Sequence, residues 1–143
     1  MRVMARDSTQ DDRLRSAQKF AVALDTHDYT ALAGLLAREC EYVATGGTFI
    51  GPERIIAAYR NVAGWMKASF DKVSYRSSVR LGAKGAVVTF VDDVERSGLP
   101  HVYTCEQELS FDAEGRIRRI VNVELPGERE AADAFLRKVG VER

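Results

Sequence analysis

The side chains best suited to chemistry lie in the run from His101 to Phe111, whose alternating pattern is typical of a β-strand. Alternation places Leu109 and Phe111 on one face of this strand, and the rest of that face carries Gln107, Cys105, Tyr103 and His101. An interior face that becomes polar toward one end indicates the mouth of a binding pocket. His101 is a candidate for catalysis there, although its position after Pro100, at the start of the strand, also fits an exposed residue.

The histidines and cysteines do not form a recognisable metal site. His27 and His101 are the only two histidines, and they are not spaced as a local ligand pair. Cys40 and Cys105 lie in separate expected strands without paired CxxC spacing, so we expect buried free thiols, as in a reducing cytoplasm. We therefore expect that the protein uses no metal and no other cofactor.

Charge and hydropathy argue against several kinds of partner. The chain contains 21 Lys and Arg residues and 21 Asp and Glu residues, so its formal net charge is zero. A neutral balance removes the usual electrostatic attraction to nucleic acid or to an acidic membrane surface. No apolar run approaches the roughly 18 residues of a membrane span, and residues 1–7 are charged, without the apolar segment of a signal peptide. We expect a cytoplasmic protein that binds neither nucleic acid nor membrane.

Hydrophobic periodicity predicts the elements that must position the strand from His101 to Phe111. Apolar residues at helical spacing predict a helix of about 16 residues that ends near Leu24, then a short helix for which Asp28 is a plausible N-cap. A strand over 40–45, a turn and a short returning strand follow, and a last helix is expected over 128–139. Four strand-like runs lie between, namely Phe70–Leu81, Ala86–Glu95, His101–Phe111 and Arg116–Leu125. Their separators are short and rich in turn residues, which predicts an antiparallel meander.

The segment Gly51-Pro52-Glu53 marks the start of a helix between the short strand pair and the meander. Gly51 permits a sharp turn, Pro52 suits the first helical position, and the helix dipole favours Glu53 in the first turn. One face of this helix carries the apolar residues Ile55, Ile56, Tyr59, Val62 and Met66. We expect the helix to lie across a curved sheet and to enclose a cavity, with Trp65 and Met66 as lid or core residues.

The run from Ala86 to Glu95 is apolar on both of its faces. One face carries Ala86, Val88 and Phe90, and the other carries Val87, Thr89 and Val91. A strand that is apolar on both faces needs cover on both, which one lidding helix cannot supply. We therefore expect a homodimer in which a second subunit packs on the outer sheet face around Ala86, Val88 and Phe90.

The order of these elements resembles the nuclear transport factor 2-like superfamily over roughly residues 10 to 137 of an expected single domain, 1–143. The segments Phe20–Tyr42, Gly51–Tyr59 and Gly115–Glu124 are most similar to the SnoaL-like group. That group includes polyketide cyclases, ketosteroid isomerase and limonene-epoxide hydrolase. The resemblance implies an α+β fold with a cone-like, curved, mixed and mostly antiparallel sheet that is lidded by N-terminal helices.

Ketosteroid isomerase resembles the chain along residues 19–24, but its functional groups are not retained. Its tyrosine donor falls at Phe20, and its general-base aspartate falls at Ala44. Its protonated aspartic acid falls near Gln107, which can donate only as an amide. Steroid isomerisation by that route is not expected.

Limonene-epoxide hydrolase resembles the chain along residues 88–94. Its first catalytic aspartate falls at Asp93, and its water-positioning tyrosine falls at Tyr42. Its arginine falls at Val91 and its second aspartate at Asn122, so the Asp-Arg-Asp relay is broken. One carboxylate cannot both deprotonate water and protonate the epoxide oxygen in that manner.

The resemblance implies a pocket whose polar residues are Tyr42, Asp93, His101, Tyr103, Gln107, Asn122 and Glu124, although Glu124 could also turn outward. Further substrate contacts are expected from Phe20, Tyr59, Trp65 and Met66. If Asp93 faces inward, desolvation raises its pKa, which suits a general acid or base near neutral pH.

We therefore expect a cofactor-independent lyase, isomerase or hydrolase of a small apolar ligand, in which Asp93 transfers the proton while Tyr42 and Asn122 orient the substrate or a water. The alternative is a non-catalytic module that binds a small hydrophobic molecule or a protein partner. Asp93 distinguishes the two, because a catalyst needs this carboxylate buried and free of a permanent cation, whereas a binding module tolerates it exposed or salt-bridged.

Overall fold

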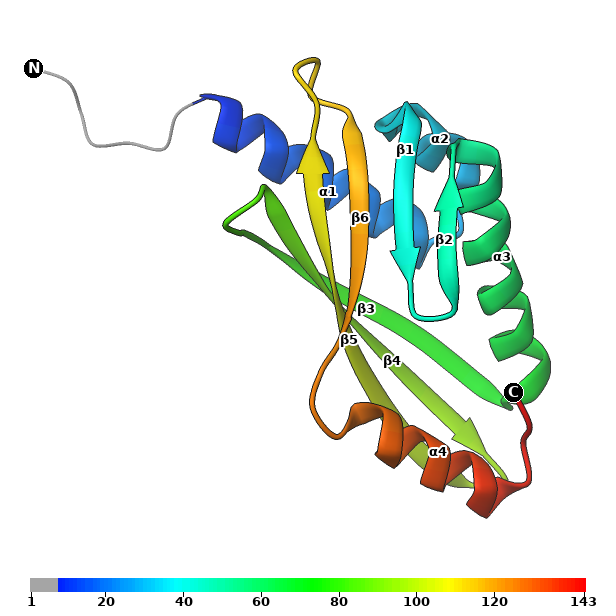
Figure 1. Cartoon of the computed structure of the whole chain (residues 1–143). Helices are drawn as coiled ribbons and strands as arrows, with labels where there is room; N and C mark the ends of the chain where they lie inside the picture. Colours follow the sequence, from blue (N-terminus) through cyan, green and yellow to red (C-terminus); the bar gives the residue numbers. More distant parts are fainter. Residues whose placement is uncertain (1–7) are drawn as a thin grey trace, which may run out of the picture.

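The computed structural model describes residues 8–143, and for Ser8 only the backbone. The expectation that residues 1–7 hold no signal peptide lies outside the described residues. The helices are α1 (Ser8–Asp25), α2 (Tyr29–Leu35), α3 (Pro52–Ser69) and α4 (Glu128–Val139) (Figure 1). The strands are β1 (Leu36–Ala44), β2 (Gly47–Ile50), β3 (Lys72–Leu81), β4 (Ala86–Arg96), β5 (Leu99–Phe111) and β6 (Ile117–Glu124).

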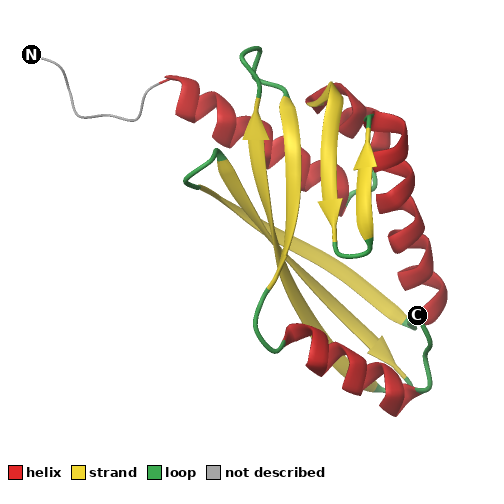
Figure 2. Cartoon of the chain, viewed as in Figure 1, coloured by secondary structure: helices red, strands yellow, loops and turns green. Residues whose placement is uncertain are grey.

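The strands form one six-stranded sheet in the order β2-β1-β6-β5-β4-β3 (Figure 2). The last four strands pair as the predicted antiparallel meander. β1 pairs antiparallel with β2 and parallel with β6, so the sheet is mixed. The expected α+β class and its mixed, mostly antiparallel sheet are therefore confirmed.

Local signals in the sequence account for most element ends. Gly51 has a φ of 92°, which favours glycine, and Pro52 and Glu53 open α3 as predicted. The last helix has the predicted bounds, 128–139. The first strand differs from the expectation, because it begins at Leu36 rather than Cys40. Leu36 caps α2 in an extended conformation and pairs with Ile117, so long-range pairing extends this strand beyond its local pattern.

The main core lies between the inner face of the sheet and the first three helices. Phe20 of α1, Leu32 of α2 and Ile55 of α3 are fully buried in one cluster. The same cluster contains Val88 of β4 and Leu109 of β5, and the inward position of Leu109 is the predicted one. Three helices rather than one therefore cover the inner face.

The predicted orientation of β4 is wrong. Ala86 and Val88 are buried in the core, and the Phe90 ring contacts the Phe20 ring at a centroid distance of 6.2 Å. These residues face inward, whereas the predicted dimer contact required them to face outward. Strand alternation groups residues by face, but it does not say which of two apolar faces meets the helices. Packing against α1 decides that choice.

The second apolar cluster closes one end of the fold. Met66 and Phe70 from the end of α3 pack there with Val94, Phe135 and Leu136. Figure 1 shows α4 beside the ends of β4 and β5, with the C-terminus returning to the end of α3. A hydrogen bond of 3.2 Å from Trp65 Nε1 to the Glu142 carbonyl oxygen fixes that return. Within residues 8–143, no helix is both long and apolar enough to cross a membrane.

Candidate functional site

A cavity of about 400 Å³ lies between the two apolar clusters. Its walls come from all four helices, α1 to α4, and from strands β1, β3, β4, β5 and β6. The predicted pocket face of β5 lines it through all four expected side chains: His101, Tyr103, Cys105 and Gln107. The expected cavity between helix and sheet is therefore present.

The register of β4 and β5 arranges the inner side chains of the cavity in rows. Successive rows are two residues apart, or about 7 Å along the strands. The rows are Val88 with Gln107, Phe90 with Cys105, Asp92 with Tyr103, and Val94 with His101. A carboxylate, Asp92, thus lies between an amide row at one end and a histidine row at the other.

The amide row belongs to a buried hydrogen-bond cluster. Gln107 is only 4% exposed, and its Oε1 accepts a hydrogen bond of 2.7 Å from the Tyr59 hydroxyl. Gln107 Nε2 donates to the Tyr42 hydroxyl and to Asn122 Oδ1, each at 3.3 Å. Tyr42 and Tyr59 stack at 4.7 Å, and burial raises the pKa of Tyr42 to about 12 and that of Tyr59 well above its usual value. Both phenols therefore remain protonated at neutral pH.

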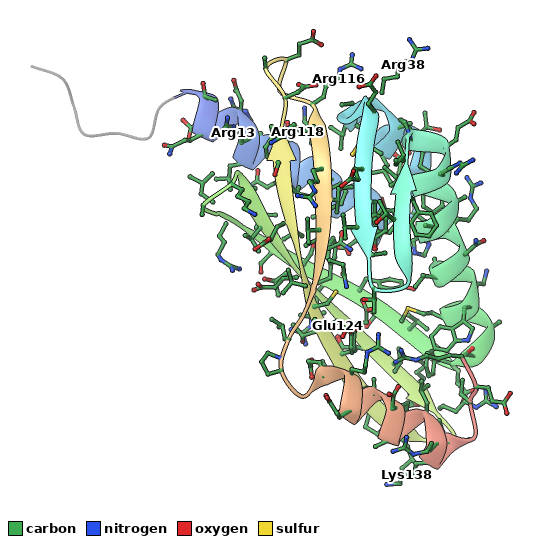
Figure 3. The ribbon with its side chains drawn as sticks, in the orientation of Figure 1. Arg13, Arg38, Arg116, Arg118, Glu124 and Lys138 are labelled. Carbon is green, nitrogen blue, oxygen red and sulfur yellow. The ribbon has the colours of Figure 1, made fainter. Side chains whose placement is uncertain are left out.

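The cluster continues to the rim of the cavity. Asn122 Nδ2 donates to Thr45 Oγ1 at 3.2 Å, and Thr45 Oγ1 donates to Glu124 Oε1 at 3.3 Å. Arg129 Nε lies 2.9 Å and 3.1 Å from the two oxygens of Glu124. Hydrogen bonds from Arg129 lower the pKa of Glu124, which keeps this carboxylate ionised. Figure 3 labels Glu124 near the end of β6, on the side of α4, and this residue lines the cavity.

Asp92 is the carboxylate that meets the requirements for a pocket acid or base. Burial, followed by the charges of Asp25 and Asp93, raises its pKa from 3.8 to about 6. Among residues 8–143, no side chain forms a hydrogen bond or an ion pair with Asp92. Asp25 lines the same cavity and accepts a hydrogen bond of 2.6 Å from Ser77 Oγ. The site therefore contains one desolvated carboxylate that has no cationic partner.

The predicted inward orientation of Asp93 is wrong. Asp93 lies on the opposite face of β4, where its Oδ2 is 3.1 Å from Arg76 Nε and its side chain is 37% exposed. Residues in a strand alternate between faces, and the inward set continues from Val88 through Phe90 to Asp92. The position that the resemblance matches to the aspartate of the epoxide hydrolase therefore lies outside the cavity.

The remaining predicted residues divide into two groups. Tyr42, Tyr59, Trp65, Met66, Tyr103, Gln107, Asn122 and Glu124 all line the cavity. Phe20 does not, because it is fully buried beneath the rings of Tyr59 and Phe90. The expectation that Phe20 contacts substrate is therefore not supported by its position.

Sequence reasoning missed several residues that line the cavity. Asp92 could have been found by continuing the alternation of Val88 and Phe90, had their inward orientation been known. The apolar side of α4 was recognised, but nothing local indicated that Phe135 and Leu136 would close the cavity. Asp25 carries no local signal, because it comes from the end of a distant helix.

His101 is held in place at the far end of the cavity. Its ring stacks on the Phe135 ring at 4.9 Å with an interplanar angle of 14°. Its Nε2 atom is buried and has no hydrogen-bond partner within residues 8–143. His101 is therefore part of the cavity wall and not an exposed residue at the start of a strand.

The described residues offer little to metal or thiol chemistry. Within residues 8–143, no group of three or more His, Cys, Asp or Glu side chains is placed to hold a metal ion. Both cysteines are free, and burial raises the pKa of Cys40 and of Cys105 to about 12. Their thiols are therefore protonated at neutral pH and are weak nucleophiles.

Several solved structures share this architecture. Bal32a, from a soil-derived mobile gene cassette, has a TM-score of 0.71 and 18% identity, covering 90% of this chain and 98% of its own. An LEH-like epoxide hydrolase from M. tuberculosis has a TM-score of 0.58 and 18% identity, with 90% and 97% covered. A protein with a ketosteroid isomerase-like fold from Catenulispora acidiphila DSM 44928, in complex with trimethylamine, has a TM-score of 0.61 and 18% identity, with 89% and 93% covered.

These similarities show that the fold is nuclear transport factor 2-like, as the resemblance implies. No protein-family model and no curated protein sequence matches the chain. At 18% identity the similarity establishes the fold alone, and one fold supports many reactions. The chemistry has to be argued from the cavity.

Proposed function

We propose that this protein is a cofactor-independent isomerase, lyase or hydrolase that transfers a proton on a small, largely apolar ligand bound in the cavity. Asp92 takes the role that the sequence had suggested for Asp93. The observation that carries this proposal is a cavity carboxylate with a pKa of about 6 and no cationic partner among the described residues. An unpaired, desolvated carboxylate is expensive to keep for stability alone.

The position of Asp92 suits both halves of a proton transfer. A pKa near 6 leaves roughly nine-tenths of the carboxylate ionised at pH 7, so it can act as a base. The same pKa makes it a stronger base than an exposed aspartate, and its conjugate acid can return the proton. Tyr42 and Asn122 lie at the amide end of the cavity and orient the polar group of the ligand.

The test uses a chromogenic probe of general-base catalysis in an apolar cavity, 5-nitrobenzisoxazole. The base removes the proton on carbon 3, the C–H electron pair forms the nitrile, and the N–O bond breaks to leave a coloured phenolate. We expect Asp92→Asn to lower kcat/KM by about 100-fold or more. The matched control is Asp93→Asn, which removes the neighbouring carboxylate on the outer face and should retain most of the activity.

Two outcomes would contradict the proposal. Equal turnover by the Asp92→Asn variant and the unmodified protein would show that Asp92 is not the base. Binding of the probe without turnover above the buffer rate would favour the non-catalytic binding module.

We also propose that the chain is a single cytoplasmic domain that forms a homodimer through the outer face of the sheet. Val102 on that face is 46% exposed, and Ile50 at the edge strand is also exposed. Val91 and Val123 belong to the same outward set by strand register, so the face offers apolar area to a second copy. Two free cysteines fit a reducing compartment.

A further inference from the structure

The Arg129–Glu124 ion pair is connected to the buried amides through Thr45. We infer that this pair fixes the direction of every hydrogen bond in the cluster, so that the cavity presents donors and selects ligands with an accepting oxygen, such as a carbonyl compound. The inference rests on the proposed function and names the ligand class of the same cavity. Arg129 and Glu124 act as positioning residues in this scheme.

The direction is imposed first at the rim. Arginine can only donate, and an ionised carboxylate can only accept. Because Glu124 accepts from Arg129 and is held ionised by it, the Thr45 hydroxyl must donate its single proton to Glu124. The Thr45 oxygen can then only accept, so the Asn122 atom that contacts it at 3.2 Å must be the NH₂ group.

The same constraint passes inward through two amides. With its NH₂ group on Thr45, Asn122 presents its carbonyl oxygen to Gln107, so the contacting atom of Gln107 is Nε2. Gln107 Oε1 consequently faces Tyr59 and takes the phenol proton at 2.7 Å. Because an amide has one donating and one accepting end, the orientation of Asn122 determines which end of Gln107 faces it.

The donors of the cluster that remain for a ligand belong to Asn122 and Tyr42. Both N–H groups of Gln107 are used, on Tyr42 and on Asn122, whereas Asn122 retains one N–H. The Tyr59 proton is committed to Gln107, whereas the Tyr42 hydroxyl accepts a hydrogen bond from Gln107 and does not use its own proton in that bond. A ligand oxygen can accept the Tyr42 proton. A ligand oxygen that accepts from both donors is also stabilised when it gains negative charge as a nearby carbon loses its proton.

A neutral side chain at position 124 no longer fixes the direction of these hydrogen bonds. The amide of Glu124→Gln can donate as well as accept, so the Thr45 hydroxyl and both amides can reverse together. Thr45→Val keeps the shape of the side chain but disconnects the rim from Asn122. Asp93→Asn is the matched control, because it removes the charge of an ion pair that lies outside the cavity.

The experiment compares 1-indanone, whose carbonyl oxygen only accepts, with indane, the corresponding hydrocarbon. We expect the unmodified protein to bind the ketone at least tenfold more tightly than the hydrocarbon, after correction for their different solubilities in water. The infrared carbonyl stretch of the bound ketone should move to lower frequency than in hexane. Glu124→Gln and Thr45→Val should lose most of both effects, and Asp93→Asn should keep them.

The outcomes separate this inference from the proposed function. Asp92→Asn should abolish proton transfer yet leave the carbonyl shift and the ketone preference intact, because Asp92 lies two rows from Gln107. Equal binding of ketone and hydrocarbon, or no detectable ketone binding, would overturn the inference. An unchanged carbonyl frequency in both Glu124→Gln and Thr45→Val would also overturn it, whatever the turnover of the proton-transfer probe.

Discussion

Asp92 and Asp93 are adjacent in β4, yet their carboxylates lie on opposite faces of the sheet. Asp92 faces the cavity without a cationic partner among the described residues, whereas Asp93 pairs with Arg76 at 3.1 Å on the outer face. One step along a strand therefore separates a desolvated carboxylate with a pKa of about 6 from a half-exposed member of an ion pair. The contrast supplies a natural pair of variants.

Replacing Asp92 with Asn should stabilise the fold at neutral pH. The folded-state pKa of about 6 lies above the usual 3.8, so the contribution of this carboxyl is fully present below pH 3.8 and is lost as the pH rises to about 6. Asp92→Asn stays neutral throughout, so we expect it to add about 1–3 kcal/mol at pH 7.5 and nothing near pH 3.5. Urea unfolding at the two pH values measures the difference. Asp93→Asn should change stability by no more than about 1 kcal/mol, and a similar response from the two variants would contradict the assignment.

The activity of the unmodified protein on 5-nitrobenzisoxazole should depend on ionised Asp92. We expect kcat/KM to rise with pH and to level off above about pH 6, the pKa of this group. Asp25 is one cause of the raised pKa, so Asp25→Asn should move the profile to lower pH. Initial rates across pH 4.5–8 provide the measurement. A profile that Asp25→Asn leaves in place would show that the two carboxylates are not coupled.

An arginine at Val102 should separate the proposed dimer without unfolding the subunit. Val102 is 46% exposed on the outer face, so the isolated subunit tolerates a charge that a dimer interface would bury. Val88→Arg should instead unfold the chain, because Val88 is completely buried in the core. Sedimentation velocity and circular dichroism distinguish these outcomes. A stable monomer of the unmodified protein would rule out the dimer.

Two glycine-to-alanine changes should have opposite effects on stability. A Cβ at Gly85 would lie 2.3 Å from the Leu109 carbonyl oxygen, so Gly85→Ala forces β4 and β5 apart. We expect a loss of about 2 kcal/mol or more in the free energy of unfolding. Gly64 lies inside α3 with nothing within 4 Å of such a Cβ, so Gly64→Ala should add about 0.5–1 kcal/mol. Thermal or urea denaturation measures both, and a neutral Gly85→Ala would show that the strand ends can separate freely.

The elements of this fold are predictable from the sequence because their signals are local. The Gly51-Pro52-Glu53 start of α3 and the bounds of α4 follow from helix-end preferences and one apolar face. The meander follows from alternating runs with short turn-rich separators. Much of the cavity was predicted as well, since Tyr42, Gln107 and Asn122 occupy inward positions on their strands.

The sequence by itself determined which side chains of a strand share a face, since the period of two is a property of the extended backbone. It did not determine which face of β4 meets the helices, because both faces are apolar and local pattern cannot rank them. Only the packing of Phe20 against Phe90 decided that question, and with it the choice of Asp92 over Asp93. The closure of the cavity by α4 and the connection from Arg129 to Gln107 likewise depend on contacts between residues distant in the chain. Such contacts form only when the sheet has brought its strands together.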